Sequence, residues 1–106
     1  MGSKDYTVDF TPEDRKRFYV ETKRGKVVRF VVQFEILINE EWHPVVRYDT
    51  VHGYAHKDIL DRRGRVIKKI EMHDMNYKKA LQIANLDIDS NWKTYKRRYF
   101  KGDKND

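Results

Sequence analysis

The sequence predicts an α+β domain, an antiparallel meander of four or five strands packed against one long carboxy-terminal helix. Between residues 27 and 38, apolar side chains occupy every second position, which places them on one face of a strand. From residue 76 onward the apolar spacing changes to three and four, which is the period of a helix. An amino-terminal part rich in strands followed by a carboxy-terminal helix is typical of a sheet covered on one face by a helix.

The strongest strand is predicted over residues 27–38. Its core face carries a run of apolar side chains at alternate positions: Val28, Phe30, Val32, Phe34, Ile36 and Ile38. After a polar turn, residues 42–49 form a second strand, with Pro44 near its beginning, where a missing N–H donor is tolerated. A third strand over residues 54–60 and a fourth over 65–72 follow, separated by glycine-containing turns.

One continuous helix is predicted from Asn76, because the apolar stripe keeps a constant phase to the end of the domain. The stripe consists of Tyr77, Leu81, Ala84, Ile88, Trp92, Tyr95 and Tyr99. At 1.5 Å per residue such a helix would be roughly 35 Å long, enough to cross a sheet of this size. Its solvent face is expected to carry Lys78, Lys79, Gln82, Asn85, Asp89, Lys93 and Lys96.

The amino-terminal region carries signals of both a helix and a strand. Thr11 and Pro12 are typical of a helix start, because threonine caps free N–H groups and proline is tolerated at the first helical position. We therefore expect a helix of a turn or two, followed by a short strand over residues 18–22. Residues 23–26 resemble a hairpin turn.

The length and composition predict one domain spanning residues 1–106, with an ordered core of about residues 6–100 and flexible termini. The absence of cysteine excludes disulfides, a cysteine nucleophile and thiolate metal sites. No apolar run is long enough to cross a membrane and no leader is recognisable, so we expect a cytoplasmic protein. The net charge of +6 favours anionic partners, nucleic acid first, although such a charge also simply keeps a small domain in solution.

Residues 47–58 form the densest polar segment and supply the candidate catalytic residues: Arg47, Asp49, His52, His56 and Asp58. Along an extended strand His52, His56 and Asp58 would point the same way. His56 beside Asp58 would give an oriented imidazole for proton transfer, and Arg47 could stabilise charge on a phosphate. This chemistry would suit cleavage of RNA without a metal.

Two other interpretations of the same segment stay open. In the first, the tyrosines of the segment pack and the histidines bond loop carbonyls, so that the segment is structural. In the second, His52 and His56 with Asp49 or Asp58 hold zinc or manganese. An extended chain would separate the two histidines by roughly 13 Å unless the Gly53 bend closes them, so no metal and no cofactor is predicted.

Basic residues lie beside aromatic ones at several places, a pattern that suits phosphate binding with base stacking. The candidate nucleic-acid-binding residues are Arg62, Arg63, Lys68, Lys96, Arg97 and Arg98. Because the neighbouring aromatics fall on predicted core stripes, the alternative is that these charges form an ordinary solvated surface.

The strand and helix motifs together resemble a family of small uncharacterised bacterial and archaeal proteins, over roughly residues 26–100. The motifs are Arg29-Phe30-Val31-Val32-Gln33, Trp42 with residues 44–49, His52-Gly53, His56, Asp58, Arg63-Gly64, Ala80-Leu81, Ala84, Asp87-Ile88, Asn91-Trp92, Tyr95 and Arg98. That resemblance implies the fold and no activity. Residues 45–60 are also distantly similar to TumE-like toxins of toxin–antitoxin pairs, which favours RNA cleavage.

The leading functional hypothesis is a nucleic-acid-binding domain, with RNA a better candidate than DNA, and a toxin-like ribonuclease as its enzymatic form. The alternative is a non-catalytic interaction module that binds a protein partner such as an antitoxin.

Overall fold

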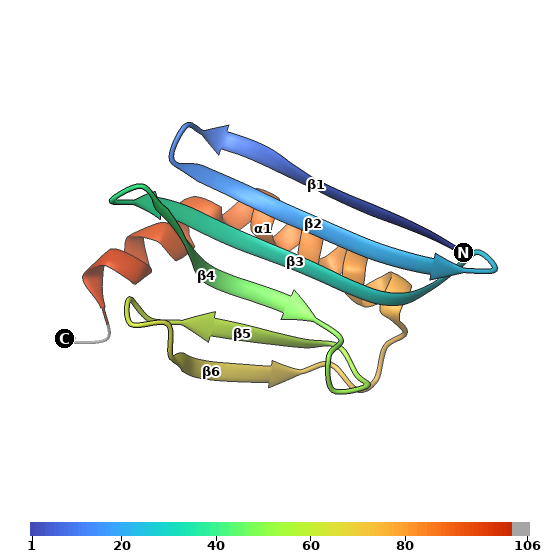
Figure 1. Ribbon diagram of the computed structural model, residues 1–106. Helices are drawn as coiled ribbons and strands as arrows, with labels where there is room; N and C mark the ends of the chain where they lie inside the picture. Colours follow the sequence, from blue (N-terminus) through green and yellow to red (C-terminus); the bar gives the residue numbers. More distant parts are fainter. Residues whose placement is uncertain (103–106) are drawn as a thin grey trace.

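The protein is represented by a computed structural model, which describes residues 1–102. Within this range it contains six strands and one helix, and the strands pair in sequence order as an antiparallel meander (Figure 1). The elements are β1 Gly2–Thr11, β2 Asp14–Lys23, β3 Lys26–Ile38, β4 Glu41–Asp49, β5 His56–Leu60, β6 Val66–Glu71 and α1 Tyr77–Lys101. The predicted fold class is therefore confirmed, with more strands than the four or five expected.

The predicted helix start at Thr11 is wrong, because this segment is the turn between β1 and β2. Pro12 and Glu13 form the turn, and the Thr11 hydroxyl accepts a hydrogen bond from the Glu13 N–H and donates one to Asp14. Proline and a side chain that bonds the backbone two residues on are as suitable for a turn as for a helix start. The β1–β2 hairpin that this turn connects accounts for the strands beyond the expected number.

Pairing also begins nearer the amino terminus than the predicted core of residues 6–100. Gly2 already pairs with Thr22 of β2, and the register continues along β1 to Thr11. The expectation for the last residues, 103–106, lies outside the described part of the chain.

The hydrophobic core lies between α1 and the inner face of the sheet (Figure 1). Phe30, Val32 and Phe34 of β3 are fully buried, and the helix covers them with Ala84 and Ile88. The alternation predicted over β3 is confirmed for these positions. Val28 is the exception: the register between β2 and β3 shifts at this point, so Val28 is exposed and Val27 packs against the core.

The helix is continuous, as the phase of its apolar stripe predicts. Asn76 is its N-cap, with Oδ1 accepting a hydrogen bond from the Lys79 N–H at 2.8 Å. Two residues of the predicted solvent face also bind β2: Asp89, which is half exposed, pairs with Lys16 at 2.7 Å, and Lys96 pairs with Asp14 at 2.9 Å. No helix within residues 1–102 is long and apolar enough to span a membrane.

Candidate functional site

The candidate site lies on the sheet face opposite α1, where β4 ends and β5 begins. Asp49 pairs with His56 and Arg47 pairs with Asp58 across the two strands. The alternate residues Tyr48 and Lys57 point to the helix side, where both reach Asp87. Because side chains alternate along a strand, Asp49, His56 and Asp58 must lie together on the other face.

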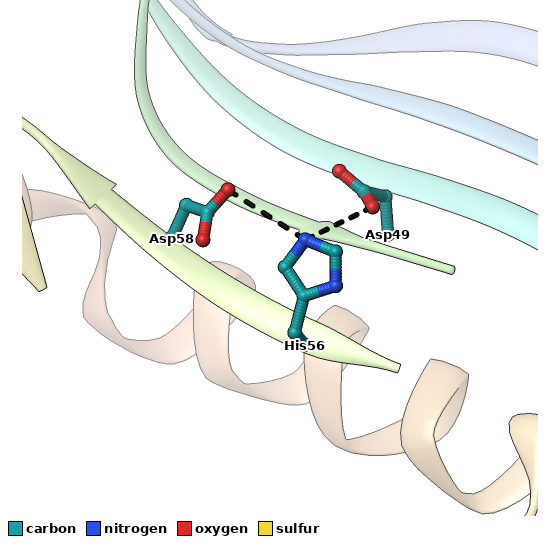
Figure 2. A group of neighbouring side chains, drawn as sticks. All are labelled: Asp49, His56 and Asp58. Atoms are coloured by element: carbon teal, nitrogen blue, oxygen red, sulfur yellow. Dashed lines mark ion pairs between the residues drawn. The ribbon is translucent and has the colours of Figure 1, made fainter. Parts of the chain in front are cut away.

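Figure 2 shows the Nε2 atom of His56 facing the carboxylates of both aspartates. Nε2 lies 3.2 Å from Asp49 Oδ1 and 3.6 Å from Asp58 Oδ2. On the other side of the cluster, Lys69 of β6 places its Nζ 3.1 Å from Asp58 Oδ1. The geometry thus brings together three of the predicted catalytic residues, which we call the Asp-His-Asp cluster: Asp49, His56 and Asp58.

The Asp-His-Asp cluster is buried although no helix within residues 1–102 covers this face. The exposed fractions of the side chains are 10% for Asp49, 1% for His56 and 9% for Asp58. The loop between β4 and β5 provides the cover, since the rings of His52 and Tyr54 lie 5.2 and 5.9 Å from that of His56. Tyr54 is itself held by a 3.0 Å hydrogen bond to Glu71 of β6.

The bend at Gly53 closes the separation of the two histidines that an extended chain would give. Residues 52 and 53 do not continue a strand but form a tight loop, with Gly53 at a positive φ of 86°. The bend therefore brings the His52 ring to 5.2 Å from the His56 ring. His52 itself is exposed and covers the cluster from the solvent side.

Arg47 is not directed to the Asp-His-Asp cluster by any contact that the structure shows. Its Nε donates a 2.6 Å hydrogen bond to Gln33 Oε1 on β3. Gln33 in turn bonds Glu35, which pairs with Arg15 of β2 at 2.7 Å. Arg47 thus belongs to a polar network that crosses β2, β3 and β4 on the sheet face opposite α1.

A second polar cluster, between the sheet and the helix, was not predicted from the sequence. Asp87 of α1 accepts hydrogen bonds from the hydroxyls of Tyr48 and Tyr95 and pairs with Lys57 at 3.2 Å. Burial and the hydrogen bond to Asp87 raise the pKa of both tyrosines. Burial alone would raise the pKa of Asp87, but the hydrogen bonds from Tyr95, Tyr48 and Asn91, with the charge of Lys57, lower it below its usual value. Tyr48 and Asp87 are far apart in the sequence and no local motif links them, so this cluster becomes visible only in the folded structure.

The predicted nucleic-acid-binding residues do not all lie at one place. Arg62 of the β5–β6 turn lies 5.7 Å from the Phe100 ring of α1, and Arg98 donates a 3.2 Å hydrogen bond to the Leu60 carbonyl. These contacts place the β5–β6 turn beside the end of the helix (Figure 1). Lys96 instead turns inward to Asp14. The other three, Arg63, Lys68 and Arg97, are exposed.

The Asp-His-Asp cluster also has the ligand types of a cation site. Each residue offers one ligand atom, and the three atoms lie within 4.8 Å of one another. Imidazole nitrogen and carboxylate oxygen are ligands that suit zinc and manganese.

Fold and site together define a class of small α+β domain, in which an antiparallel meander carries a buried Asp-His-Asp cluster on the face away from its helix. The chain belongs to the family described as a domain of unknown function, DUF7718, which it matches over residues 1–105. This agrees with the predicted resemblance to an uncharacterised family and extends it beyond residues 26–100. Searches of curated proteins and of solved structures gave no match.

Proposed function

We propose that the protein binds single-stranded nucleic acid, RNA in preference to DNA, through a surface that we call the basic end. The observation that carries the proposal is the meeting of the β5–β6 turn with the last turns of α1, two segments far apart in the sequence. The basic end consists of Arg62, Arg63, Arg97, Arg98, Lys101 and Phe100.

The chemistry of this surface fits a single strand. Arginine and lysine neutralise phosphates and release counterions, which supplies affinity without sequence readout. Phe100 is 43% exposed, and an aromatic ring and a guanidinium plane such as that of Arg62 are both surfaces on which unpaired bases stack. The distant resemblance of residues 45–60 to TumE-like toxins further favours RNA as the ligand.

Binding is better supported than cleavage. Only 1% of the His56 side chain is exposed, so a ribose hydroxyl has no access to its Nε2 in this conformation. His56 also lies at the opposite end of β5 from the basic end, roughly 13 Å from Leu60 at 3.3 Å per residue. His52 is the exposed histidine of the segment, and its removal is the direct test for any cleavage.

The test compares two double variants that remove the same charge. Arg62→Ala/Arg63→Ala alters the basic end, whereas Lys23→Ala/Arg24→Ala alters the β2–β3 turn at the opposite end of the sheet (Figure 1). Binding of a fluorescein-labelled single-stranded RNA is measured by anisotropy across a range of salt concentrations. Loss of two phosphate contacts should weaken binding about tenfold and reduce the magnitude of the log–log salt slope by about 1.4.

Equal effects of the two double variants, or no salt dependence in the wild type, would contradict the proposal. The same RNA is analysed on a denaturing gel with wild type and His52→Ala. Cleavage by the wild type that is lost in His52→Ala would establish a ribonuclease. A DNA strand of the same sequence tests the preference for RNA.

A protein partner is the alternative, and the β6 edge of the sheet favours it. Every residue of β6 is exposed, including Val66, Ile67 and Ile70, and its outer backbone has no neighbouring strand among the described residues. Edge strands of this kind can accept a strand from another chain. If the ligand is a protein that adds to β6, its binding should be lost in the Ile67→Asp variant and retained in the Arg62→Ala/Arg63→Ala variant. The opposite result would favour the basic end as the binding surface.

A further inference from the structure

We propose that Asp49, His56 and Asp58 form a binding site for one divalent transition-metal ion of the zinc and manganese class. The site lies at the other end of β5 from the basic end and is independent of nucleic-acid binding. It differs from the arrangement considered from sequence, because both aspartates take part and His52 lies over the cluster rather than completing it.

The distances within the cluster suit an ion. Zinc bonds to imidazole nitrogen and carboxylate oxygen at about 2.0–2.2 Å, which places two ligands of a tetrahedral site about 3.4 Å apart. His56 Nε2 lies 3.2 Å from Asp49 Oδ1 and 3.6 Å from Asp58 Oδ2, on either side of that value. The three ligand atoms lie within 4.8 Å of one another, so the two carboxylates must move toward each other by up to about 1.4 Å to reach the tetrahedral separation.

Asp49 Oδ1 accepts a 3.0 Å hydrogen bond from the Val51 N–H, but contacts among the described residues leave the imidazole of His56 incompletely satisfied. One N–H on Nε2 can be aimed at one carboxylate, yet Nε2 faces two (Figure 2). His56 Nδ1 is buried and has no hydrogen-bond partner within the described chain, whereas the buried Asp58 Oδ1 is paired with the Lys69 ammonium 3.1 Å away. Buried polar atoms without partners are rare and costly, and two buried carboxylates that converge on one nitrogen are a further cost. A divalent ion would bind the three facing ligand atoms at once and neutralise both carboxylates.

Lys69 is the group that opposes an ion, because its ammonium lies 3.1 Å from Asp58 Oδ1. It stands on the edge strand β6 and its side chain is 37% exposed, so it can turn to water when an ion enters. The lysine therefore competes with the metal for Asp58. Its removal should tighten binding, which a purely structural role of the cluster does not predict.

Three protein ligands with at least one position left open are typical of metal sites that bind water or a substrate, whereas structural zinc sites are usually closed by four ligands. The open position would lie under the β4–β5 loop, where the rings of His52 and Tyr54 control access from solvent. The loop turns at Gly53, whose positive φ is unfavourable for other residues.

The experiment titrates zinc chloride and manganese chloride into chelator-treated full-length protein by isothermal titration calorimetry. Cobalt chloride provides a second readout, since its visible spectrum reports coordination by nitrogen and oxygen. One ion per chain is expected. Asp49→Asn and Asp58→Asn should each weaken binding at least tenfold, because the amide keeps the shape and removes the charge. Lys69→Ala should tighten binding about tenfold.

The matched control is His43→Ala/His73→Ala, which removes two histidines outside the cluster that could bind metal at the surface. This control should leave affinity and the cobalt spectrum unchanged. No binding by the folded wild type, or loss of binding in the histidine control, would overturn the proposal. If the aspartate variants fail to fold, the Lys69→Ala variant decides, because this surface substitution leaves the cluster intact, and an unchanged affinity would reject the site.

Discussion

The hydroxyl of Tyr48 on β4 donates a hydrogen bond to Oδ2 of Asp87 on α1, with 2.7 Å between the two oxygens. The hydroxyl of Tyr95 donates a hydrogen bond to the same Asp87 oxygen, and the ammonium of Lys57 on β5 lies 3.2 Å from that oxygen. The middle of the helix is therefore fixed to β4 and β5 by polar contacts, in addition to its apolar packing on β3.

Tyr48→Phe should lower the free energy of unfolding by about 1–3 kcal/mol, because it removes a hydrogen bond to a half-buried carboxylate and keeps the ring in the core. Urea denaturation followed by circular dichroism measures the change. Tyr6→Phe is the matched control, since the Tyr6 ring stacks on Phe18 and is 45% exposed. An equal loss in the two variants would show that the hydroxyl of Tyr48 has no special contribution.

Stability should decline at alkaline pH because of the same cluster. The folded-state pKa values of Tyr48 and Tyr95 are raised, so the folded protein holds these protons more tightly than the unfolded chain. The contribution of the two tyrosines to folding stability is complete below their unfolded-state pKa of about 10. It is lost as the pH rises above that pKa toward the folded-state value. The difference in unfolding free energy between wild type and Tyr48→Phe should therefore shrink between about pH 9 and pH 11. A constant difference would contradict this assignment.

Asp87 should make the stability of the protein decline at acidic pH. Its pKa is lowered in the folded state, so its contribution is present above the unfolded value of about 4 and is lost as pH falls through the folded value. Asp87→Asn should be less stable than wild type near neutral pH and should lose less stability on acidification. Thermal unfolding in a series of acidic buffers measures both effects, and parallel curves for the two proteins would exclude Asp87 as a source of the acid dependence.

Asn76→Ala should destabilise the protein by about 1 kcal/mol, because the Asn76 side chain accepts a hydrogen bond from an N–H that the first helical turn leaves free. Ser90→Ala is the control within the same helix, at an exposed position where alanine is the better helix former. Chemical denaturation should show a loss for the first variant and no loss for the second. Destabilisation by both would indicate a general sensitivity of α1.

Glu40→Gly should stabilise the protein by about 1 kcal/mol. Asn39 and Glu40 form the β3–β4 turn with φ values of 52° and 68°, and an Asn-Gly pair is the preferred sequence for a two-residue turn with positive φ at both positions. Glu40→Gln separates the effect of backbone strain from that of charge, since it keeps the Cβ and removes the carboxylate. An equal gain from both substitutions would assign the effect to charge.

The central strand and the helix were predictable because each buries one face against a single neighbour. The alternation from Phe30 to Ile36 and the phase of Ala84 and Ile88 follow from that one-sided burial. The β1–β2 hairpin was not predictable, because Asp14 and Lys16 occupy inward-facing, buried positions of β2. Their ion-pair partners, Lys96 and Asp89, lie more than 70 residues away, so the sequence pattern gives no reason to place charges in a core.

The candidate site was predictable in part. His56 and Asp58 lie two residues apart on one strand, which is sufficient to place them on the same face. Asp49 joins them through the register between β4 and β5, and His52 approaches through the turn at Gly53. The register and the loop conformation depend on long-range pairing and on a backbone φ that periodicity does not encode.

The amino-acid sequence by itself determined the order of β3 to β6 and α1, the core faces of β3 and of the helix, and the pool of polar residues between positions 47 and 58. The tertiary structure decided which of those residues meet, because a carboxylate on one strand becomes the neighbour of an imidazole on the next only when the strands pair in one register. It also decided which charges are buried in pairs and which remain at the basic end, since burial depends on the partner that the fold supplies.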